Sequence, residues 1–143
     1  MPGIGDTNRL ATIFDHIVAE GLVYPSLAAG ATVVSANVDW TMGNYATVVP
    51  INTITSRFHI HSISIETCNR NAVFELELYH GATRFLVSGI RFAIAGGFFG
   101  NSMYPISSIL IPANEIVEAR VASSNGTAEI ATVTMSICYC IEV

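Results

Sequence analysis

Side-chain polarity alternates with a period of two along much of this chain, and that alternation limits the folds open to it. In Ala72–His80, the apolar residues Phe74, Leu76 and Leu78 are separated by polar neighbours. A period of two places the apolar side chains on one face of a β-strand, whereas a helix would spread them around its surface. The segment therefore predicts a half-buried strand.

Similar segments follow one another from Tyr45 to the end of the chain, separated by turn residues. This spacing predicts an antiparallel β-sandwich or jelly roll with about eight strands. Asn125-Gly126 favours the tight turn of a β-hairpin after the strand that ends at Ser123. The expected strands are Tyr45–Val49, Arg57–Glu66, Ala72–His80, Phe85–Ile94, Met103–Ile111, Glu115–Ser123 and Glu129–Val143.

The start of the chain has a different pattern, and we expect a helix and connecting arm (1–44) before the β-sandwich domain (45–143). Apolar residues in 6–20 recur at helical spacing and form one stripe. This short helix either packs on its own domain or docks on a neighbouring subunit. Gly21–Asn44 is expected to be a loose connection with one strand at Ala31–Ala36. The stripe residues expected to contact a partner are Leu10, Ile13, Phe14 and Ile17.

Charged residues are scarce: 12% of the chain is charged and 51% is hydrophobic, with six Arg, no Lys and eleven acidic residues. Soluble domains normally carry about 25% charged residues. Because obligate interfaces are apolar, we expect other subunits to cover much of the surface. A formal net charge of −5 without a basic cluster predicts no nucleic acid partner. No apolar run reaches the roughly 20 residues of a spanning helix, so no membrane partner is expected.

The last expected strand carries no charged side chain on either face over most of its length. Val133, Met135 and Ile137 face one way, while Thr134 and Ser136 face the other. A strand of this kind is expected to be covered on both sides, as a central strand at a subunit interface would be. The pattern predicts a homo-oligomer.

The chain has three cysteines, Cys68, Cys138 and Cys140. The first residues lack the basic and apolar regions of a secretory signal. Cys138 and Cys140 are neighbours on one strand, and such pairs rarely satisfy disulfide geometry. We expect three reduced thiols in a protein made in the cytoplasm. A zinc site is the alternative, but no Cys-x-x-Cys spacing supports it.

His59 and His61 are expected on the same face of a strand, with Glu66 after them, close enough to share a metal. This spacing is similar to the first metal motif of the cupins. Thr53 stands where that motif has glycine, however, and the second cupin motif is missing. His80 ends a different strand, and nothing in the sequence brings it to the other two. We expect hydrogen-bonded strand histidines and no metal, with a cupin-like metal protein as the alternative.

No catalytic arrangement emerges from the remaining polar residues. Glu75 and Glu77 are expected to form cross-strand ion pairs with Arg91 and Arg120 on a partly exposed face. The chain has no Gly-x-Ser-x-Gly nucleophile elbow. We therefore expect neither enzymatic activity nor a cofactor.

Two aromatic features are candidate contact sites. The glycine-rich stretch Gly96–Gly100 lacks the Lys and the following helix of a phosphate-binding loop. Its Phe98 and Phe99 are candidate partner-binding residues on a wide loop. Trp40 is expected to close one end of the sandwich as a core residue, with a ligand platform as the alternative.

Several segments between residues 38 and 142 together form a recognisable pattern. They are AVFELELY at Ala72–Tyr79, IPANE at Ile111–Glu115, ARVASS at Ala119–Ser124 and VTMSI at Val133–Ile137, with Trp40, Gly43 and Phe58–His61 upstream. This part of the chain resembles a group of small virion proteins of tailed bacteriophages. Those proteins have jelly-roll-like domains and act as capsid decoration (cement) proteins or as knobs on heads and fibres.

The resemblance implies a non-catalytic structural protein that binds and stabilises the phage head lattice. Its partners would be copies of itself, as a trimer, and the major capsid protein. It would be made in the bacterial host cytoplasm and lie on the capsid surface of the virion. A receptor-binding domain of a tail fibre or head knob is the alternative.

Overall fold

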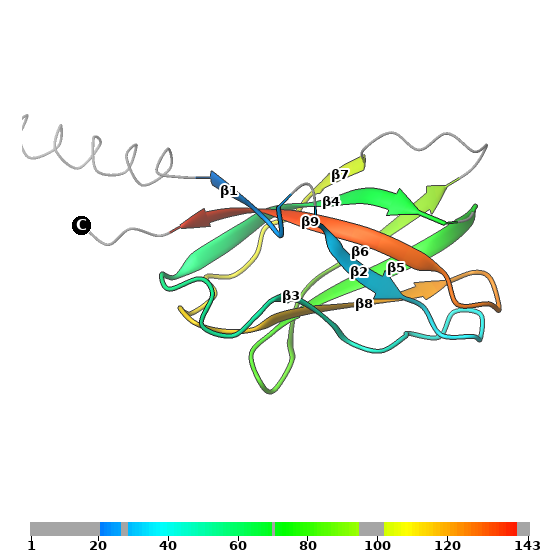
Figure 1. The fold of residues 1–143 in the computed structure, drawn as a ribbon, viewed down its shortest axis with the longest axis horizontal. Coiled ribbons are helices and arrows are strands. Elements are labelled where there is room, and N and C mark those ends of the chain that lie inside the picture. Colours follow the sequence, from blue (N-terminus) through cyan, green and yellow to red (C-terminus); the bar gives the residue numbers. More distant parts are fainter. Residues whose placement is uncertain (1–20, 27–28, 70, 95–101, 140–143) are drawn as a thin grey trace, which may run out of the picture.

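The computed structural model describes residues 21–26, 29–69, 71–94 and 102–139, whose regular structure consists of β-strands (Figure 1). These residues form nine strands. They are β1 (Gly21–Tyr24), β2 (Ala31–Val34), β3 (Ala46–Val49), β4 (Phe58–Cys68), β5 (Ala72–His80), β6 (Phe85–Ile94), β7 (Ser102–Pro105), β8 (Val117–Ser123) and β9 (Ile130–Tyr139).

The strands form two antiparallel sheets that enclose a common interior (Figure 1). The five-stranded sheet has the order β1-β9-β4-β7, and β2 also pairs with β9. The four-stranded sheet has the order β3-β8-β5-β6. Eight of the strands thus divide as β2-β9-β4-β7 and β3-β8-β5-β6, which is the interleaved order of a jelly roll. The predicted antiparallel β-sandwich or jelly roll is confirmed.

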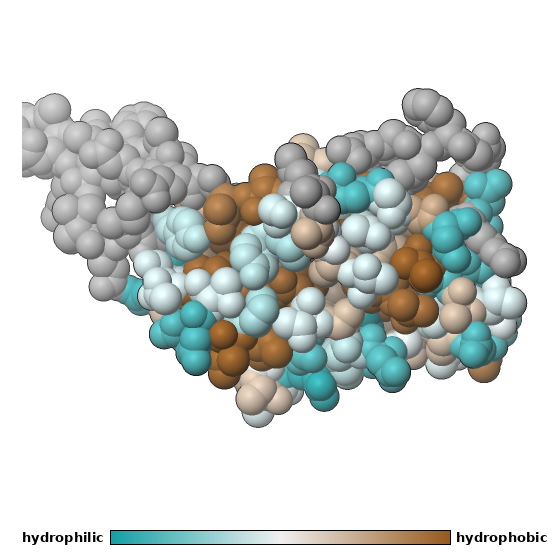
Figure 2. Space-filling view, viewed as in Figure 1, coloured by the Kyte–Doolittle hydropathy of each residue, from teal (hydrophilic) through white to brown (hydrophobic). Residues whose placement is uncertain are grey.

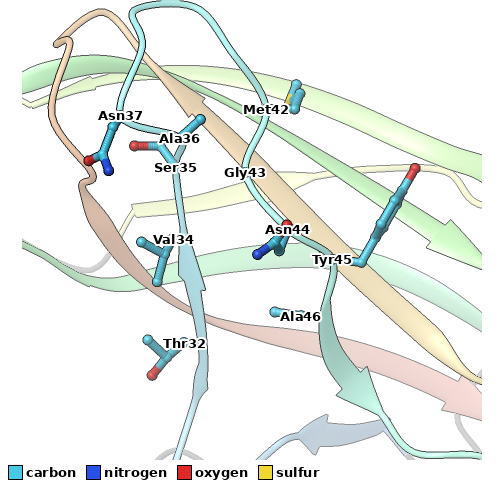
Figure 3. Close-up of a pocket in the computed structure, with 10 residues that line it drawn as sticks. All are labelled: Thr32, Val34, Ser35, Ala36, Asn37, Met42, Gly43, Asn44, Tyr45 and Ala46. Atoms are coloured by element: carbon cyan, nitrogen blue, oxygen red, sulfur yellow. The ribbon is translucent and has the colours of Figure 1, made fainter.

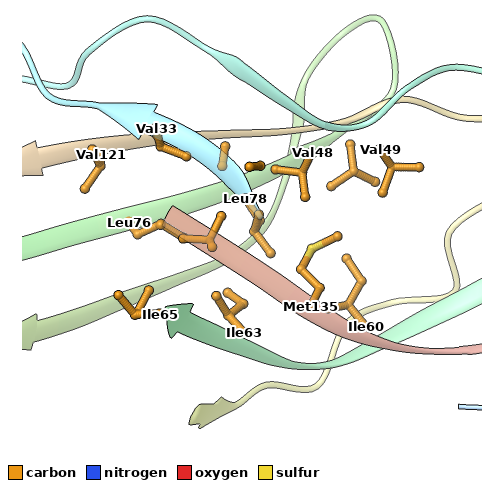
Figure 4. Packing of buried hydrophobic residues seen from close by; sticks show 14 of the residues in the cluster. Val33, Val48, Val49, Ile60, Ile63, Ile65, Leu76, Leu78, Val121 and Met135 are labelled. Atoms are coloured by element: carbon orange, nitrogen blue, oxygen red, sulfur yellow. The ribbon is translucent and has the colours of Figure 1, made fainter. Parts of the chain in front are cut away.

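The core lies between the two sheets and consists of the side chains that alternate inward. Ile63 on β4 and Met135 on β9 come from one sheet, and Leu76 and Leu78 on β5 come from the other (Figure 4). All four are 0% exposed. Alternation buries one face of each sheet in this way because successive side chains of a strand point to opposite sides.

An aromatic contact joins the sheets at the edge formed by β6 and β7. The rings of Phe74 and Phe92 stack with centroids 5.2 Å apart. Phe92 also lies 5.8 Å from the ring of Tyr104, which belongs to the other sheet. Tilted and offset aromatic pairs of this kind add to the stabilisation from burial.

Strand β9 is the central strand of its sheet. It pairs with β4 along one edge and with β1 and β2 along the other. The prediction that the last strand is central is therefore confirmed for its described part, residues 130–139.

The stretch Gly21–Asn44 is less loose than the sequence predicted. The expected strand is present as β2, and β1 precedes it. Both hydrogen-bond to β9, and Ala31 and Val33 of β2 belong to the core. The sheet therefore includes part of the segment assigned to the arm. The predicted helix and the contact residues Leu10, Ile13, Phe14 and Ile17 lie outside the described residues.

The Asn125-Gly126 turn does not make the hairpin that the sequence predicted. Strand β8 lies in the four-stranded sheet and β9 in the five-stranded sheet, so this connection crosses between sheets. Neither residue has the positive φ that a type I′ turn requires. The Ser123 hydroxyl instead accepts a hydrogen bond from the Asn125 amide at 2.9 Å, which shapes a local turn.

The segment expected as one strand, Met103–Ile111, is only partly a strand. Strand β7 ends at Pro105, and the chain then follows β4 through single backbone hydrogen bonds. The amide of Ile106 donates to the carbonyl of His61 at 2.8 Å, and Ile111 exchanges two such bonds with Phe58. No helix in the described ranges has the length and apolar character needed to cross a membrane.

Replacing Leu76 by Ala should lower the free energy of unfolding by about 3 kcal/mol, because it leaves a cavity among fully buried side chains. Urea denaturation followed by circular dichroism measures this change. Thr47→Ala, at an exposed position of β3, is the control and should change stability by less than about 0.5 kcal/mol. An equal effect of the two substitutions would contradict the assigned core.

Two truncations test where the folded unit begins. A chain that starts at Gly21 keeps all nine described strands and should fold. A chain that starts at Asn37 lacks β1 and β2 and removes Val33 from the core, so it should lose about 3 kcal/mol or more. Thermal and urea denaturation compare the two with the full chain. If the chain from Gly21 unfolds, residues 1–20 stabilise the domain itself and do not form an arm.

Candidate functional site

The outer face of the four-stranded sheet carries the ion pairs that the sequence predicted. Arg91 on β6 lies 2.7 Å from Glu75 on β5. Arg120 on β8 lies 3.0 Å from Glu77 on the same neighbouring strand. The registers place each pair directly across adjacent strands, so opposite charges face each other at the surface.

These pairs extend into a network of aromatic and arginine side chains. Arg120 also donates a hydrogen bond of 2.7 Å to the hydroxyl of Tyr79, which in turn donates to Glu77. The guanidinium of Arg84 lies 3.9 Å from the ring centroid of Tyr45. Burial and the hydrogen bond to Glu77 raise the pKa of Tyr79, so its hydroxyl keeps its proton. The network satisfies its own charges and suits a face exposed to water.

The outer face of the five-stranded sheet is built from short hydroxyl side chains. The strand registers align them in rows across β9 and β4, so that Ser136 faces Ser62 and Thr134 faces Ser64. In a further row, Thr132 of β9 lies between Thr32 of β2 and Thr67 of β4. The rows, read across the sheet, are Val23–Ser136–Ser62–Pro105, Thr134–Ser64–Met103 and Thr32–Thr132–Thr67.

Charge is divided unequally between the two sheets. Among the described strands of the five-stranded sheet, Glu66 is the only Asp, Glu, Lys or Arg. It accepts a hydrogen bond of 2.8 Å from the hydroxyl of Thr134. The four-stranded sheet holds five such residues in its strands, namely Glu75, Glu77, Arg91, Glu118 and Arg120. In Figure 2, the teal hydrophilic residues of the visible surface lie mainly toward its margins, with pale and brown residues between them.

The three histidines considered as metal ligands do not converge. His59 and His61 lie on β4, beside a hollow of about 260 Å³ that Ser107 and Ser108 also line. A β-bulge falls between Ile60 and Ser62, and the Nδ1 atom of His59 lies 3.2 Å from the carbonyl oxygen of Ser108. Within the described residues, no group of three His, Cys, Asp or Glu side chains is arranged to hold a metal.

His80 lies in the other sheet and forms a separate pair. Its Nδ1 atom lies 2.5 Å from a carboxylate oxygen of Glu115, and the His80 side chain is 8% exposed. The other ring nitrogen is buried without a hydrogen-bond partner in the described part of the chain. Glu115 thus holds one ring nitrogen, and burial keeps the other away from the surface. The pair therefore fits a structural role at the end of β5.

A shallow groove lies where the edges of the two sheets approach each other (Figure 3). It has a volume of about 410 Å³ and lies between β2 and the segment that leads into β3. Its lining has no charged side chain, and Tyr45 is the one aromatic residue in it. Gly43 is required on this rim, because a Cβ atom there would lie 1.8 Å from the carbonyl oxygen of Val34. The polar groups of the groove are the hydroxyls of Thr32, Ser35 and Tyr45 and the amides of Asn37 and Asn44.

Trp40 is not the core residue that the sequence predicted. Its side chain is 48% exposed, and the guanidinium of Arg91 lies 5.0 Å from its ring. The backbone at Trp40 has a φ of 53°, which is rare outside glycine, and its amide donates to the carbonyl of Ser123 at 2.7 Å. The indole therefore lies at the surface beside Arg91 and does not close the end of the sandwich. The aromatic candidates Phe98 and Phe99 lie outside the described residues.

Sequence reasoning identified only part of the hydroxyl face. It recognised that Thr134 and Ser136 share one side of the last strand, but it missed Ser62 and Ser64 on β4. The signal for them is present, because Ser alternates with Ile in this part of β4. That two such faces lie side by side depends on the pairing of β4 with β9, which joins segments far apart in the chain.

Comparison of the sequence with family models and with curated proteins finds no match. Among solved structures, a chain in the structure of infectious bursal disease virus Gx strain matches 82% of this chain at 13% identity, with a TM-score of 0.41. A chain in the structure of the Gt strain matches 85% at the same identity and TM-score. This chain spans 32% of the length of each of those chains. At this TM-score, the likeness establishes neither a common fold nor a common function.

Cys68 should react slowly with thiol reagents near neutral pH. Burial, with a smaller contribution from the nearby charge of Glu129, raises the pKa of the Cys68 thiol to about 11. Because only the thiolate is nucleophilic, labelling should rise as the pH passes from about 9 toward 11. Mass spectrometry after timed alkylation measures the rate at this position. Labelling at pH 8 as fast as in the urea-unfolded chain would contradict the raised pKa.

Proposed function

We propose that this protein is a non-catalytic structural component of a phage virion that attaches to the head lattice as a decoration protein. The division of charge between the two outer faces is the observation that supports this proposal most directly. The four-stranded face, with its paired Arg and Glu side chains, is suited to water. The five-stranded face, with Glu66 as its one charged strand residue, has the charge depletion typical of protein interfaces.

The architecture supports the same proposal. A jelly roll closed by two sheets over one apolar core is a stiff unit. A decoration protein requires such a unit, together with surfaces that bind capsid subunits and copies of itself. The proposal includes the major capsid protein as a partner. It also includes self-association, for which the resemblance implies a trimer. It also includes the apolar stripe at Leu10, Ile13, Phe14 and Ile17, and Phe98 and Phe99, as contact residues.

Trp40 gives support to a second candidate, a receptor-binding domain on a tail fibre or head knob. A large exposed aromatic side chain held by a strained backbone is typical of a surface selected for contact. Arg91 and Glu75 beside it would supply polar contacts to a ligand.

The location of the protein on virions tests both candidates. Antibodies raised against the purified chain should label the head lattice of particles from the genome that encodes it, at regular positions in cryo-electron micrographs. Particles lacking the protein should release their DNA at a lower temperature than complete particles, because bound decoration subunits stabilise the shell by mass action. Label at the tail tip or head knob would favour the receptor-binding candidate, and virions without label would refute both.

A further inference from the structure

We infer that Asn125 is a site of spontaneous modification, at which the side-chain amide becomes a carboxylate beside the buried carboxylate of Glu129. Asn125 lies in the connection between β8 and β9, which crosses from one sheet to the other (Figure 1). The change needs no enzyme and is independent of the proposed function. It places a second negative charge where the structure has a neutral hydrogen-bond donor.

The reaction begins at the backbone nitrogen of Gly126. This nitrogen attacks the side-chain carbonyl carbon of Asn125, and a new C–N bond closes a five-membered cyclic imide. The side-chain amide takes up the proton that the backbone nitrogen loses and leaves as ammonia. Water then opens the imide at either carbonyl, which gives aspartate or isoaspartate. Water is the only other reactant, and no atom is oxidised or reduced.

The residue that follows Asn125 makes ring closure easy. Asn125 is the only one of the nine asparagines in the chain that is followed by glycine. Glycine has no Cβ atom to hinder the approach of its nitrogen to the side chain before it. A Cβ atom added at Gly126 would have no neighbour within 4 Å, so the surrounding structure also leaves this position open. Gly126 is exposed, which gives water access to the imide.

The connection is held at its two ends but not at the reacting bond. On one side, the amide of Ser124 donates to the carbonyl of Val73 at 2.8 Å. On the other, the amide of Glu129 donates to the hydroxyl of Ser35 at 2.9 Å. Among the described residues, the amide of Gly126 donates to no partner. Its nitrogen can therefore attack without first losing a hydrogen bond.

The new carboxylate forms next to a buried charge. The Nδ2 atom of Asn125 lies 3.5 Å from Oε1 of Glu129, which is 0% exposed. Replacing this donor by an anionic oxygen removes an attraction and brings two negative charges together where water screens them poorly. The backbone of Glu129 also accepts a hydrogen bond of 2.9 Å from the amide of Ser35, just after β2. Modification therefore weakens the attachment of β2 to the start of β9.

Incubation of the full chain at pH 8 and 37 °C tests the reaction. Peptide mass spectrometry should show loss of the amide at Asn125, with isoaspartate among the products, while the exposed Asn71, which precedes alanine, keeps its amide. The matched variant G126A should convert at least about 10-fold more slowly, because its methyl group hinders ring closure. It should fold normally, since position 126 has no positive φ. Equal rates at Asn125 and Asn71, or no effect of G126A, would overturn the inference.

Urea unfolding tests the coupling to Glu129. N125D carries the charge of the product, whereas N125A loses the same donor without adding charge. The equilibrium constant for unfolding should be at least about 10-fold larger for N125D than for N125A, because only the first sets two carboxylates against each other. In the E129Q background this ratio should fall below about 3-fold, and the cost of E129Q itself cancels within that pair. N125D as stable as N125A, or a ratio unchanged by E129Q, would overturn the coupling.

Discussion

Burial of apolar side chains between the two sheets is the interaction on which the rest of this structure depends. Every long strand contributes one face to that interior, and side chains such as Leu76 and Met135 are completely removed from water. Hydrophobic burial of this kind is the dominant favourable term in folding. Because alternation assigns each second residue to the interior, the remaining residues form two outer faces that are free to differ in chemistry.

The two outer faces do differ, and their difference is the main functional information in the structure. One face pairs Glu75, Glu77, Arg91 and Arg120 with one another across neighbouring strands, which keeps charge at the surface without leaving a net field. The other replaces charge by rows of Ser and Thr with exposed Val, Ile and Met beside them. A chain with only 12% charged residues can place a normal density of charge on one of its faces but not on both.

The ends of the sandwich add two features that the faces do not explain. Trp40 points outward from a connection between β2 and β3, on a backbone conformation that costs energy. His80 and Glu115 form a close pair beneath the β5–β6 turn, where the ring of Phe85 lies 5.7 Å from the imidazole. The first exposes a large aromatic ring, whereas the second holds a buried imidazole against a carboxylate.

Local patterns predicted the strands well where the alternation was strong. The bounds of β5 and β6 were predicted correctly, and the expected partners of Glu75 and Glu77 were the ones found. Prediction failed where the outcome depended on distant contacts. Asn125-Gly126 favoured a hairpin by local preference, yet β8 and β9 pair with strands of different sheets. Gly21–Tyr24 is short and has little pattern of its own, and it becomes a strand because the edge of β9 is available to it.

The sequence by itself determined which residues alternate, and therefore that the chain forms a β-sandwich with one polar and one apolar side to most strands. It also determined that charge would be scarce, since composition does not depend on the fold. Only the tertiary structure decided that β4 lies beside β9, and hence that two separate hydroxyl stripes combine into one uncharged face. Strand order follows from which pairings bury the most apolar surface together. That is a property of the whole chain, and no local segment contains it.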